Sequence, residues 1–119
     1  MKTTLRLLII EDSEDDALLL ERELSKNGYD LESLRVDTPE ALKSALATGE
    51  WDIVVADYVM PHFSGLDALQ MLRESGIDTP FIIVSGKIGE DTAVKAMKAG
   101  ANDYILKGNL ARLLSLIHI

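Results

Sequence analysis

The sequence predicts an α/β fold in which helices cover both faces of a five-stranded parallel sheet. Short apolar runs alternate with longer segments of helical periodicity, and this alternation occurs five times along the chain. Three of the runs are almost continuously apolar, which is typical of parallel strands covered on both faces. The connections are short, as expected for β-α units joined by right-handed crossovers.

Five apolar runs are the predicted strands, at residues 5–10, 31–36, 53–56, 81–84 and 103–106. The first, third and fourth are the nearly continuous ones. The second, LESLRV, alternates apolar and polar residues, so we expect it at an edge of the sheet.

A recognisable start signal precedes each predicted helix. The five signals are Ser13, Thr38-Pro39, Ser64, Glu90-Asp91 and Asn109. Ser13 is followed three residues later by Asp16, which is the spacing of a capping box. A proline such as Pro39 suits the first turn of a helix, and Asn27-Gly28 is typical of a helix C-terminus.

Each predicted helix carries an apolar stripe at helical spacing, which we expect to face the sheet. The stripe residues are Ala17, Leu20 and Leu24; Leu42, Ala45 and Leu46; Leu66, Leu69 and Leu72; Ala93, Met97 and Gly100; and Leu110, Leu113, Leu114 and Ile117. Met71 and Met97 are interpreted as core residues and not as part of a ligand-binding surface.

The composition is that of an ordinary soluble globular protein, with 47% hydrophobic and 27% charged residues. Cysteine is absent, which excludes disulfides and thiol chemistry and fits a cytoplasmic location. The apolar run near the amino terminus is too short for a signal-peptide core, and no stretch is long enough to span a bilayer. The formal charge of −8 argues against a general basic surface for nucleic acid or anionic lipid.

The length of 119 residues fits one compact domain, residues 1–119. The last predicted helix has only about three turns before the chain stops, which is brief for the element that closes such a fold. We therefore expect a domain cut from a longer protein.

Polar side chains follow four of the five predicted strands. Glu11 and Asp12 follow the first, Asp57 the third, Ser85 the fourth and Lys107 the fifth. In open α/β sheets, ligands bind outside the carboxyl ends of the strands. The second strand instead ends in a predicted turn.

Each of these residues also has a simpler interpretation. Glu11 and Asp12 alone could favour the positive end of the following helix, by about 0.3–1 kcal/mol. Asp57 or Ser85 alone could belong to a turn, and Lys107 alone could be a solvated surface charge. Their coincidence at one edge of one sheet favours a functional site.

The residue types at this edge predict phosphoryl chemistry. Like charges about 4 Å apart repel by roughly 1 kcal/mol in water and about 4 kcal/mol at an effective dielectric constant of 20, so three carboxylates require a cation. Oxygen ligands without His or Cys suit Mg²⁺ or Mn²⁺. A lysine and a hydroxyl would bind phosphoryl oxygens, and one carboxylate would remain as the nucleophile.

The segments LLIIEDSEDD, VVADYVMPHFSGLDAL and PFIIVSGKIGEDTAVKAMKAGANDYILK, in this order and spacing, resemble the receiver domain of two-component response regulators. The resemblance covers about residues 5–114. It implies a flavodoxin-like doubly wound sheet with strand order 2-1-3-4-5. It also implies a domain that controls signalling in a phosphorelay and has no external substrate, so it would not be an enzyme in the usual sense.

The resemblance assigns a role to each residue at the strand ends. Asp57 would accept a phosphoryl group from a phosphohistidine. The metal ligands would be Glu11, Asp12, Asp57 and the backbone carbonyl of Val59. Lys107 would pair with the phosphoryl oxygens, Ser85 would follow them with its hydroxyl, and Tyr104 would be the switch aromatic; a plain strand aromatic is the other interpretation of Tyr104.

The implied donor is a sensor histidine kinase or a histidine phosphotransfer protein. The implied output is a partner or an attached domain that contacts the face formed by the fourth helix, fifth strand and fifth helix. We expect no direct nucleic-acid or membrane binding, and a monomer or weak homodimer.

One departure from the family pattern follows the lysine. The family commonly has Lys-Pro with a cis peptide bond, whereas this chain has Lys107-Gly108. We expect either a trans bond with a backbone that glycine permits or a rarer cis bond. His62 is interpreted as an exposed loop residue that is neutral and not catalytic, and Lys87 is a candidate for tuning kinase recognition or hydrolysis of the phosphoryl group.

Two other classes of function are weighed against the receiver domain. A phosphatase of the haloacid type needs a second aspartate two residues after the nucleophile, and that position is Val59. A phosphorylation-independent interaction module with the receiver fold typically lacks the acidic pair or the lysine. Both features are present here.

Overall fold

The computed structural model describes residues 3–60, 63–86 and 90–117. Its strands are β1 (Thr3–Ile10), β2 (Tyr29–Val36), β3 (Ile53–Asp57), β4 (Phe81–Ser85) and β5 (Asp103–Leu106). Its helices are α1 (Glu14–Lys26), α2 (Pro39–Thr48), α3 (Gly65–Glu74), α4 (Glu90–Lys98) and α5 (Ala111–Leu116), and a 3₁₀ turn, η1 (Lys107–Asn109), precedes α5.

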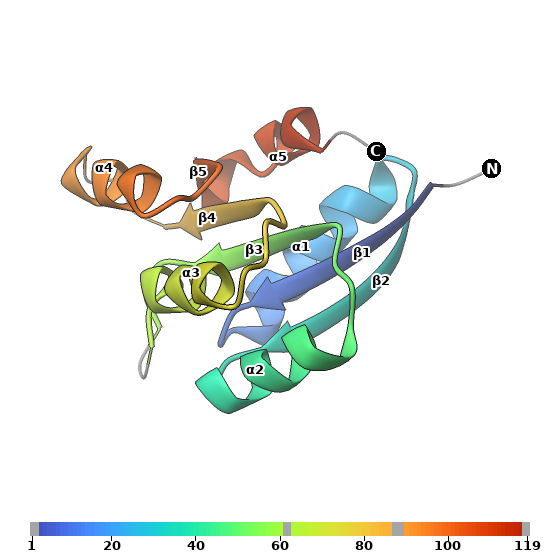
Figure 1. Cartoon of the computed structure of the whole chain (residues 1–119). Helices are drawn as coiled ribbons and strands as arrows, with labels where there is room; N and C mark the ends of the chain where they lie inside the picture. Colours follow the sequence, from blue (N-terminus) through green and yellow to red (C-terminus); the bar gives the residue numbers. More distant parts are fainter. Residues whose placement is uncertain (1–2, 61–62, 87–89, 118–119) are drawn as a thin grey trace.

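The strands form one parallel sheet in the order β2-β1-β3-β4-β5, and the predicted fold class is confirmed. The alternating second strand lies at the edge, as expected. Figure 1 shows the sheet as a central layer with helices on both sides. The chain thus follows the β-α alternation that the apolar runs predicted.

Two hydrophobic cores hold the layers together, one on each face of the sheet. On one face, α1 and α5 contribute Leu24 and Leu113 to a core that includes Leu7 and Ile9 of β1. On the other face, α2, α3 and α4 pack against the sheet. They contribute the fully buried residues Leu42, Leu69 and Ala96, respectively, to the second core. Strands β3 and β4 are buried along their whole length, which explains their continuously apolar sequences.

Several helix signals behave as predicted. Ser13 accepts a hydrogen bond from the Asp16 backbone N–H at 3.2 Å, and Thr38 caps α2 with Pro39 in its first turn. The cap at Ser64 is a complete capping box with Asp67. At the start of α1, however, the capping box is only half formed: the Ser13 N–H donates to the Glu11 carboxylate instead.

The prediction for the last helix was wrong at its start. Asn109 does not cap a helix; it ends the 3₁₀ turn η1, and α5 begins at Ala111 without a side-chain cap. Ile117 lies beyond α5 in extended backbone, although it is buried as expected.

The apolar stripe of α4 was predicted only in part. Ala93 packs against the core as expected and Ala96 is fully buried, whereas Met97, predicted as a core residue, is 47% exposed. The buried face therefore runs through Ala93 and Ala96, at a spacing of three residues. Within the part of the chain that is described, no helix has the length and apolar character needed to cross a membrane.

Candidate functional site

The strand register brings the predicted site residues to one edge of the sheet. Asp57 is the last residue of β3 and is paired with Val84, so Ser85 lies one position further along β4. Ser85 in turn pairs with Leu106, the residue before Lys107. On the other side of β3, Ala56 pairs with Ile10, immediately before the acidic pair. The carboxyl ends of four strands therefore present their polar residues together.

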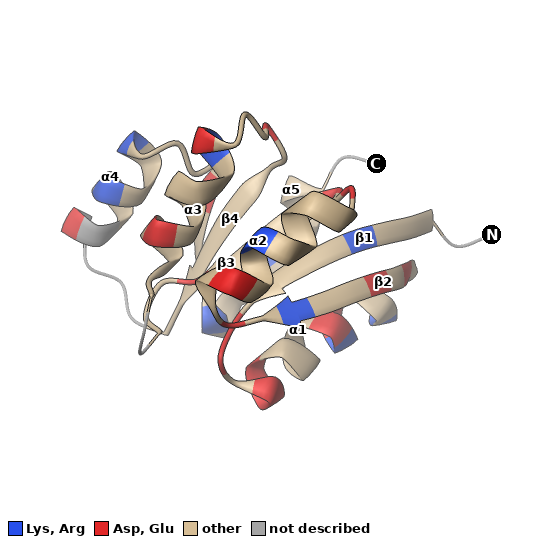
Figure 2. Ribbon diagram, turned by 60° about the horizontal axis from the view of Figure 1, so that its bottom comes forward, with Lys and Arg blue, Asp and Glu red and all other residues tan. Residues whose placement is uncertain are grey.

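Three carboxylates form a compact cluster at this edge. One carboxylate oxygen from each of Glu11, Asp12 and Asp57 lies within 4.8 Å of the other two. Glu11 and Asp57 are buried, and Asp12 is exposed. Figure 2 shows the negative charge continuing through the segment between β1 and α1 into the first turn of α1.

This cluster fits a small hard cation. Three carboxylates supply only oxygen ligands, the type that Mg²⁺ prefers, and the exposed side of the cluster leaves room for further oxygen ligands. Close carboxylates at this degree of burial repel one another strongly without a neutralising charge. The donor set is therefore suited to Mg²⁺ or Mn²⁺ and unsuited to zinc.

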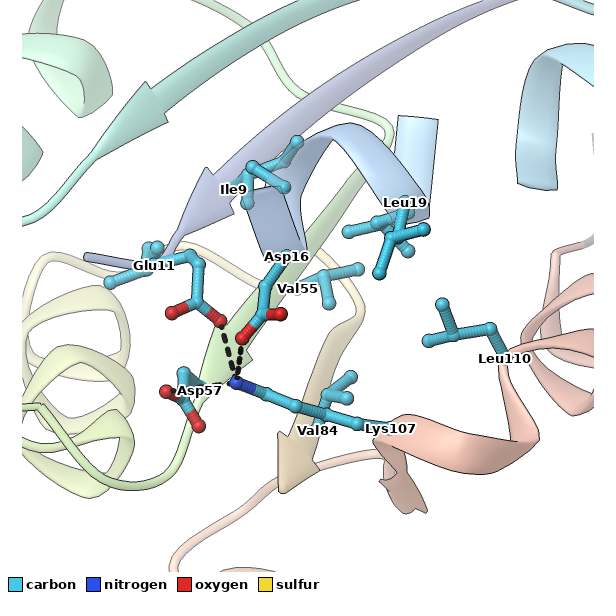
Figure 3. Close-up of a pocket in the computed structure, with 12 residues that line it drawn as sticks. Ile9, Glu11, Asp16, Leu19, Val55, Asp57, Val84, Lys107 and Leu110 are labelled. Atoms are coloured by element: carbon cyan, nitrogen blue, oxygen red, sulfur yellow. Dashed lines mark hydrogen bonds and ion pairs between the residues drawn. The ribbon is translucent and has the colours of Figure 1, made fainter. Parts of the chain in front are cut away.

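Lys107 supplies the positive charge that the structure itself places at the cluster. Its Nζ lies 2.6 Å from an oxygen of Asp16, 3.2 Å from Glu11 and 3.3 Å from Asp57. Figure 3 shows the lysine side chain reaching across the pocket so that its ammonium meets the three carboxylates. Lys107 follows β5, whereas Asp16 lies in α1, so the contact joins segments far apart in sequence.

Burial in this pocket changes the pKa of the Glu11 carboxyl group. Ile9, Val55 and Val84 line the pocket that also holds the carboxylates and the lysine stem (Figure 3). Burial raises the pKa of Glu11 to about 7, and the nearby charge of Asp57 adds to the increase, against a hydrogen bond from the Ser13 backbone that lowers it.

The pKa of Lys107 is also raised, but by its carboxylate partners and not by burial. Burial alone would lower the pKa of its ammonium group, but hydrogen bonds to Asp16 and Glu11 and the charges of Glu11 and Asp57 outweigh burial and raise the pKa. Lys107 is therefore fully charged at neutral pH, as a group that neutralises carboxylate or phosphoryl oxygens must be.

The loop after Asp57 is shaped by one close backbone approach. Gly65, the first residue of α3, donates its N–H to the Tyr58 carbonyl at 3.2 Å. A Cβ at this glycine would lie 2.7 Å from the Asp57 carbonyl oxygen. The Val59 N–H points toward an Asp57 carboxylate oxygen at 3.4 Å, and the Val59 residue is 69% exposed. The glycine thus lets the loop close tightly behind the strand that carries Asp57.

Ser85 and Tyr104 are both buried. Ser85 is 4% exposed at the end of β4. Tyr104 is 7% exposed, more buried than a half-covered strand aromatic would be, and its ring centre lies 6.5 Å from that of Tyr58 in a tilted arrangement. Tyr58 directly follows Asp57, so this aromatic pair connects the site to β5.

Two further residues at the site were missed in the sequence. Asp16 was interpreted only as a capping residue, yet its carboxylate accepts a hydrogen bond from Lys107 Nζ at 2.6 Å. Its place in the acidic first turn of α1, just after the predicted metal ligands, is the signal that could have placed it near the site. Arg35 donates to the Glu11 carbonyl at 3.1 Å and pairs with Glu14. His62 and Lys87 lie outside the described residues.

The Lys107-Gly108 peptide bond is trans, because the described residues contain no cis peptide bond. Gly108 belongs to the 3₁₀ turn η1, and its φ is not positive. The chain therefore satisfies the first of the two expectations for this bond without using the left-handed backbone region that glycine allows.

Comparison with known proteins decides the family. The family model described as the response regulator receiver domain matches residues 7–118. The chain belongs to this family. Among curated relatives, it is 36% identical over 103 residues to the transcriptional regulatory protein DltR of Streptococcus agalactiae, covering 87% of this chain and 45% of that protein. It is also 36% identical over 102 residues to the response regulator MprA of a Mycobacterium species, covering 86% of this chain and 44% of that protein.

Solved receiver domains have the same fold. The receiver domain of the Francisella response regulator 1452 matches with a TM-score of 0.82 and 28% identity, covering 95% of this chain and 93% of that one. The chemotaxis response regulator CheY4 of Vibrio cholerae has a TM-score of 0.80 at 16% identity, covering 98% and 100% of the two chains. The flavodoxin-like architecture is thereby confirmed. The receiver domain spans a little under half the length of the curated relatives DltR and MprA.

The raised pKa of Glu11 predicts a pH-dependent response to Mg²⁺. In the unfolded chain this carboxyl has its ordinary pKa of 4.5, and in the folded protein about 7. Between these values the folded state holds more protons, so the free energy of unfolding of the metal-free protein falls as pH rises through this window. If this cluster is a metal site, Mg²⁺ would require the ionised carboxylate, so it should raise the melting temperature more at pH 8 than at pH 6.

Thermal unfolding with and without Mg²⁺ at these two pH values measures this effect. Glu11→Gln is the control: it cannot ionise, so the difference between the two Mg²⁺-induced shifts should shrink. A larger Mg²⁺ effect at pH 6 than at pH 8 in the unmodified protein would contradict the prediction.

Proposed function

We propose that this receiver domain accepts a phosphoryl group on Asp57 in a Mg²⁺-dependent reaction and thereby switches the state of a partner or output domain. One observation carries the proposal: buried Asp57 shares one sheet edge with the acidic pair and with a fully charged lysine 3.3 Å away. The cluster combines a nucleophile, a cation site and a counter-charge for phosphoryl oxygens.

The reaction needs little covalent chemistry from the protein. An Asp57 carboxylate oxygen attacks the phosphorus of a phosphohistidine, the new O–P bond forms, and the P–N bond breaks. Its electron pair returns to the imidazole nitrogen of the donor. Lys107 neutralises the phosphoryl oxygens from one side, as its present contact with the Asp57 carboxylate supports.

Glu11, Asp12, Asp57 and the Val59 carbonyl would hold Mg²⁺. When bound, the ion neutralises phosphoryl oxygens and offsets the repulsion between them and the acidic cluster. Asp12 is the exposed member of the carboxylate cluster, so a ligand arriving from solvent meets it first.

Ser85 and Tyr104 are proposed to transmit the change. Ser85 lies one position past the β4 residue that pairs with Asp57, which supports a role for its hydroxyl in binding the phosphoryl oxygens. The buried Tyr104 packs near Tyr58, directly after the phosphoacceptor. A shift of these two side chains would change the conformation of the surface formed by α4, β5 and α5. A partner or output domain would bind to this surface.

The biological setting follows from the family. The donor is proposed to be a sensor histidine kinase or a histidine phosphotransfer protein, in the cytoplasm. The relative DltR is named as a transcriptional regulatory protein, and the match covers only 45% of its length, which supports an output domain elsewhere in a longer protein. We propose that residues 1–119 act as a single receiver domain, monomeric or weakly dimeric. Its substrate is its own Asp57, so it has no external substrate; Val59 stands where a haloacid-type phosphatase needs an aspartate.

The test is incubation with acetyl phosphate or phosphoramidate, followed by intact-protein mass spectrometry. A phosphoryl adduct is expected with Mg²⁺ and not when a chelator replaces it. In the Asp12→Asn protein, half-maximal phosphorylation should require a higher concentration of Mg²⁺. The absence of an adduct under all conditions would overturn the proposal and favour a phosphorylation-independent interaction module, and an adduct that forms equally well in chelator would overturn the metal requirement.

A further inference from the structure

The shortest ion pair of Lys107 is with a residue that has no role in the proposed reaction. The Lys107 ammonium lies 2.6 Å from Asp16, against 3.2 Å to Glu11 and 3.3 Å to Asp57. In Figure 3, Asp16 descends from α1 and its carboxylate meets the ammonium at the end of the lysine side chain. The ammonium group of Lys107 is thus held by a residue of α1, far from Lys107 in the sequence.

Asp16 is distinct from the metal-binding group. The carboxylates that lie within 4.8 Å of one another are those of Glu11, Asp12 and Asp57, and Asp16 is not among them. The Asp16 side chain is 37% exposed, whereas those of Glu11 and Asp57 are 7% and 8% exposed. A cation bound to the buried cluster would compete with Lys107 for Glu11 and Asp57. It would leave the contact between Asp16 and the ammonium in place.

Lys107 needs a partner of this kind. A lysine side chain has about 2 kcal/mol of rotamer entropy to lose when it is fixed in one position. Gly108, the residue that follows it, has no side chain, and a Cβ there would meet nothing within 4 Å, so this neighbour does not fix the lysine side chain. The ammonium is directed by its ion pairs with Asp16, Glu11 and Asp57.

Asp16 is well placed to provide that direction. Its backbone N–H is fixed by the Ser13 cap at the start of α1. The next residue, Ala17, is buried in the core between α1 and the sheet, which fixes the helix on its inner side. The carboxylate therefore projects from a rigid turn.

We propose that Asp16 is a positioning residue for phosphoryl transfer, and that it holds the Lys107 ammonium over Asp57 through this ion pair. The inference rests on the proposed function, because it says which residue holds Lys107 in place for that reaction. As a consequence, the Lys107 ammonium stays beside Asp57 before, during and after transfer. Its ion pair with Asp16 persists throughout, because neither the metal nor the phosphoryl group takes the place of Asp16.

The first experiment measures how fast acetyl phosphate with Mg²⁺ phosphorylates the protein. Asp16→Asn should slow the reaction about tenfold, because a displaced charged group loses much of its effect on the transition state. Asp15→Asn is the matched control: it removes the same charge from the same turn of α1, where Asp15 is exposed. It should react at nearly the original rate. Asp16→Glu, which keeps the carboxylate, should recover part of the loss.

A double-mutant cycle with Lys107→Met assigns the effect to the ion pair. In the Lys107→Met protein, Asp16→Asn should cause no further slowing. A second measurement needs neither metal nor phosphoryl donor: acylation of Lys107 by acetic anhydride, followed by peptide mass spectrometry. Asp16→Asn should make Lys107 react several-fold faster, and Asp15→Asn should not.

The outcomes separate this inference from the proposed function. If the unmodified protein forms no phosphoryl adduct, both fail. If the unmodified protein and Asp15→Asn are phosphorylated and Asp16→Asn reacts at the same rate or faster, the positioning role is overturned while the proposed function stands. Equal slowing by Asp16→Asn with and without Lys107 would also overturn it.

Discussion

Lys107→Met is expected to slow phosphorylation of Asp57 by about 10²-fold or more, the usual cost of removing one preorganised charge from a transition state. The ammonium lies within 3.3 Å of Glu11 and Asp57, both almost fully buried. Methionine preserves most of the length and apolar surface of the lysine stem but no charge. The rate with acetyl phosphate and saturating Mg²⁺ measures the loss.

The same substitution should also change how the metal-free protein responds to pH. Without the ammonium, the repulsion between Glu11 and Asp57 is uncompensated, so the free energy of unfolding should fall most at high pH and should recover on addition of Mg²⁺. Lys26→Met is the control, because Lys26 is exposed at the end of α1. A Lys107→Met protein that is phosphorylated at the original rate would show that the lysine has no part in the reaction.

Gly65→Ala should both destabilise the protein and displace the phosphoacceptor. The added Cβ would lie 2.7 Å from the Asp57 carbonyl oxygen and 3.3 Å from the Tyr58 Cα, and both are backbone atoms that cannot rotate away. The loop must shift, and overpacking of this kind costs about 1–3 kcal/mol. A lower urea midpoint and slower phosphorylation are therefore expected together.

Gly86→Ala is the matched control for this change. Gly86 also follows a strand at the same edge of the sheet, but a Cβ there would meet nothing within 4 Å. Its unfolding free energy should change by no more than about 0.5 kcal/mol. If Gly65→Ala were as stable and as rapidly phosphorylated as Gly86→Ala, the close approach behind Asp57 would be unimportant.

The fold could be predicted because its determinants are local and repeated. A strand buried on both faces requires a continuous apolar run, and β3 and β4 have one. The edge position of β2 follows from its alternating pattern, which leaves one side polar. The order of the strands came from the family resemblance, since periodicity alone does not say which strands are neighbours.

The carboxylate cluster could be predicted for a related reason. Residues that follow parallel strands share one edge, so Glu11, Asp12, Asp57 and Lys107 had to meet there once the sheet was correct. Their roles in the reaction remain predictions, which the experiments above address.

The errors arose where long-range contacts override a local signal. Ser13 and Asp16 have the spacing of a capping box, but the Asp16 carboxylate turns to a lysine 91 residues away. Asn109 resembles a helix cap, but the segment that starts at Lys107 first winds into a 3₁₀ turn. In α4, Ala96 and Met97 are adjacent and both apolar, so the stripe could be drawn through either; the structure buries the smaller one.

The central claim is that Asp57 itself carries the phosphoryl group, and borohydride trapping tests it most directly. An aspartyl phosphate is an acyl phosphate, and its reduction converts the side chain to homoserine, which peptide mass spectrometry locates. After treatment with acetyl phosphate and Mg²⁺, homoserine is expected at position 57, and Asp57→Asn should give none. Homoserine at another aspartate, or a phosphoryl adduct that persists in Asp57→Asn, would contradict the assignment of the site.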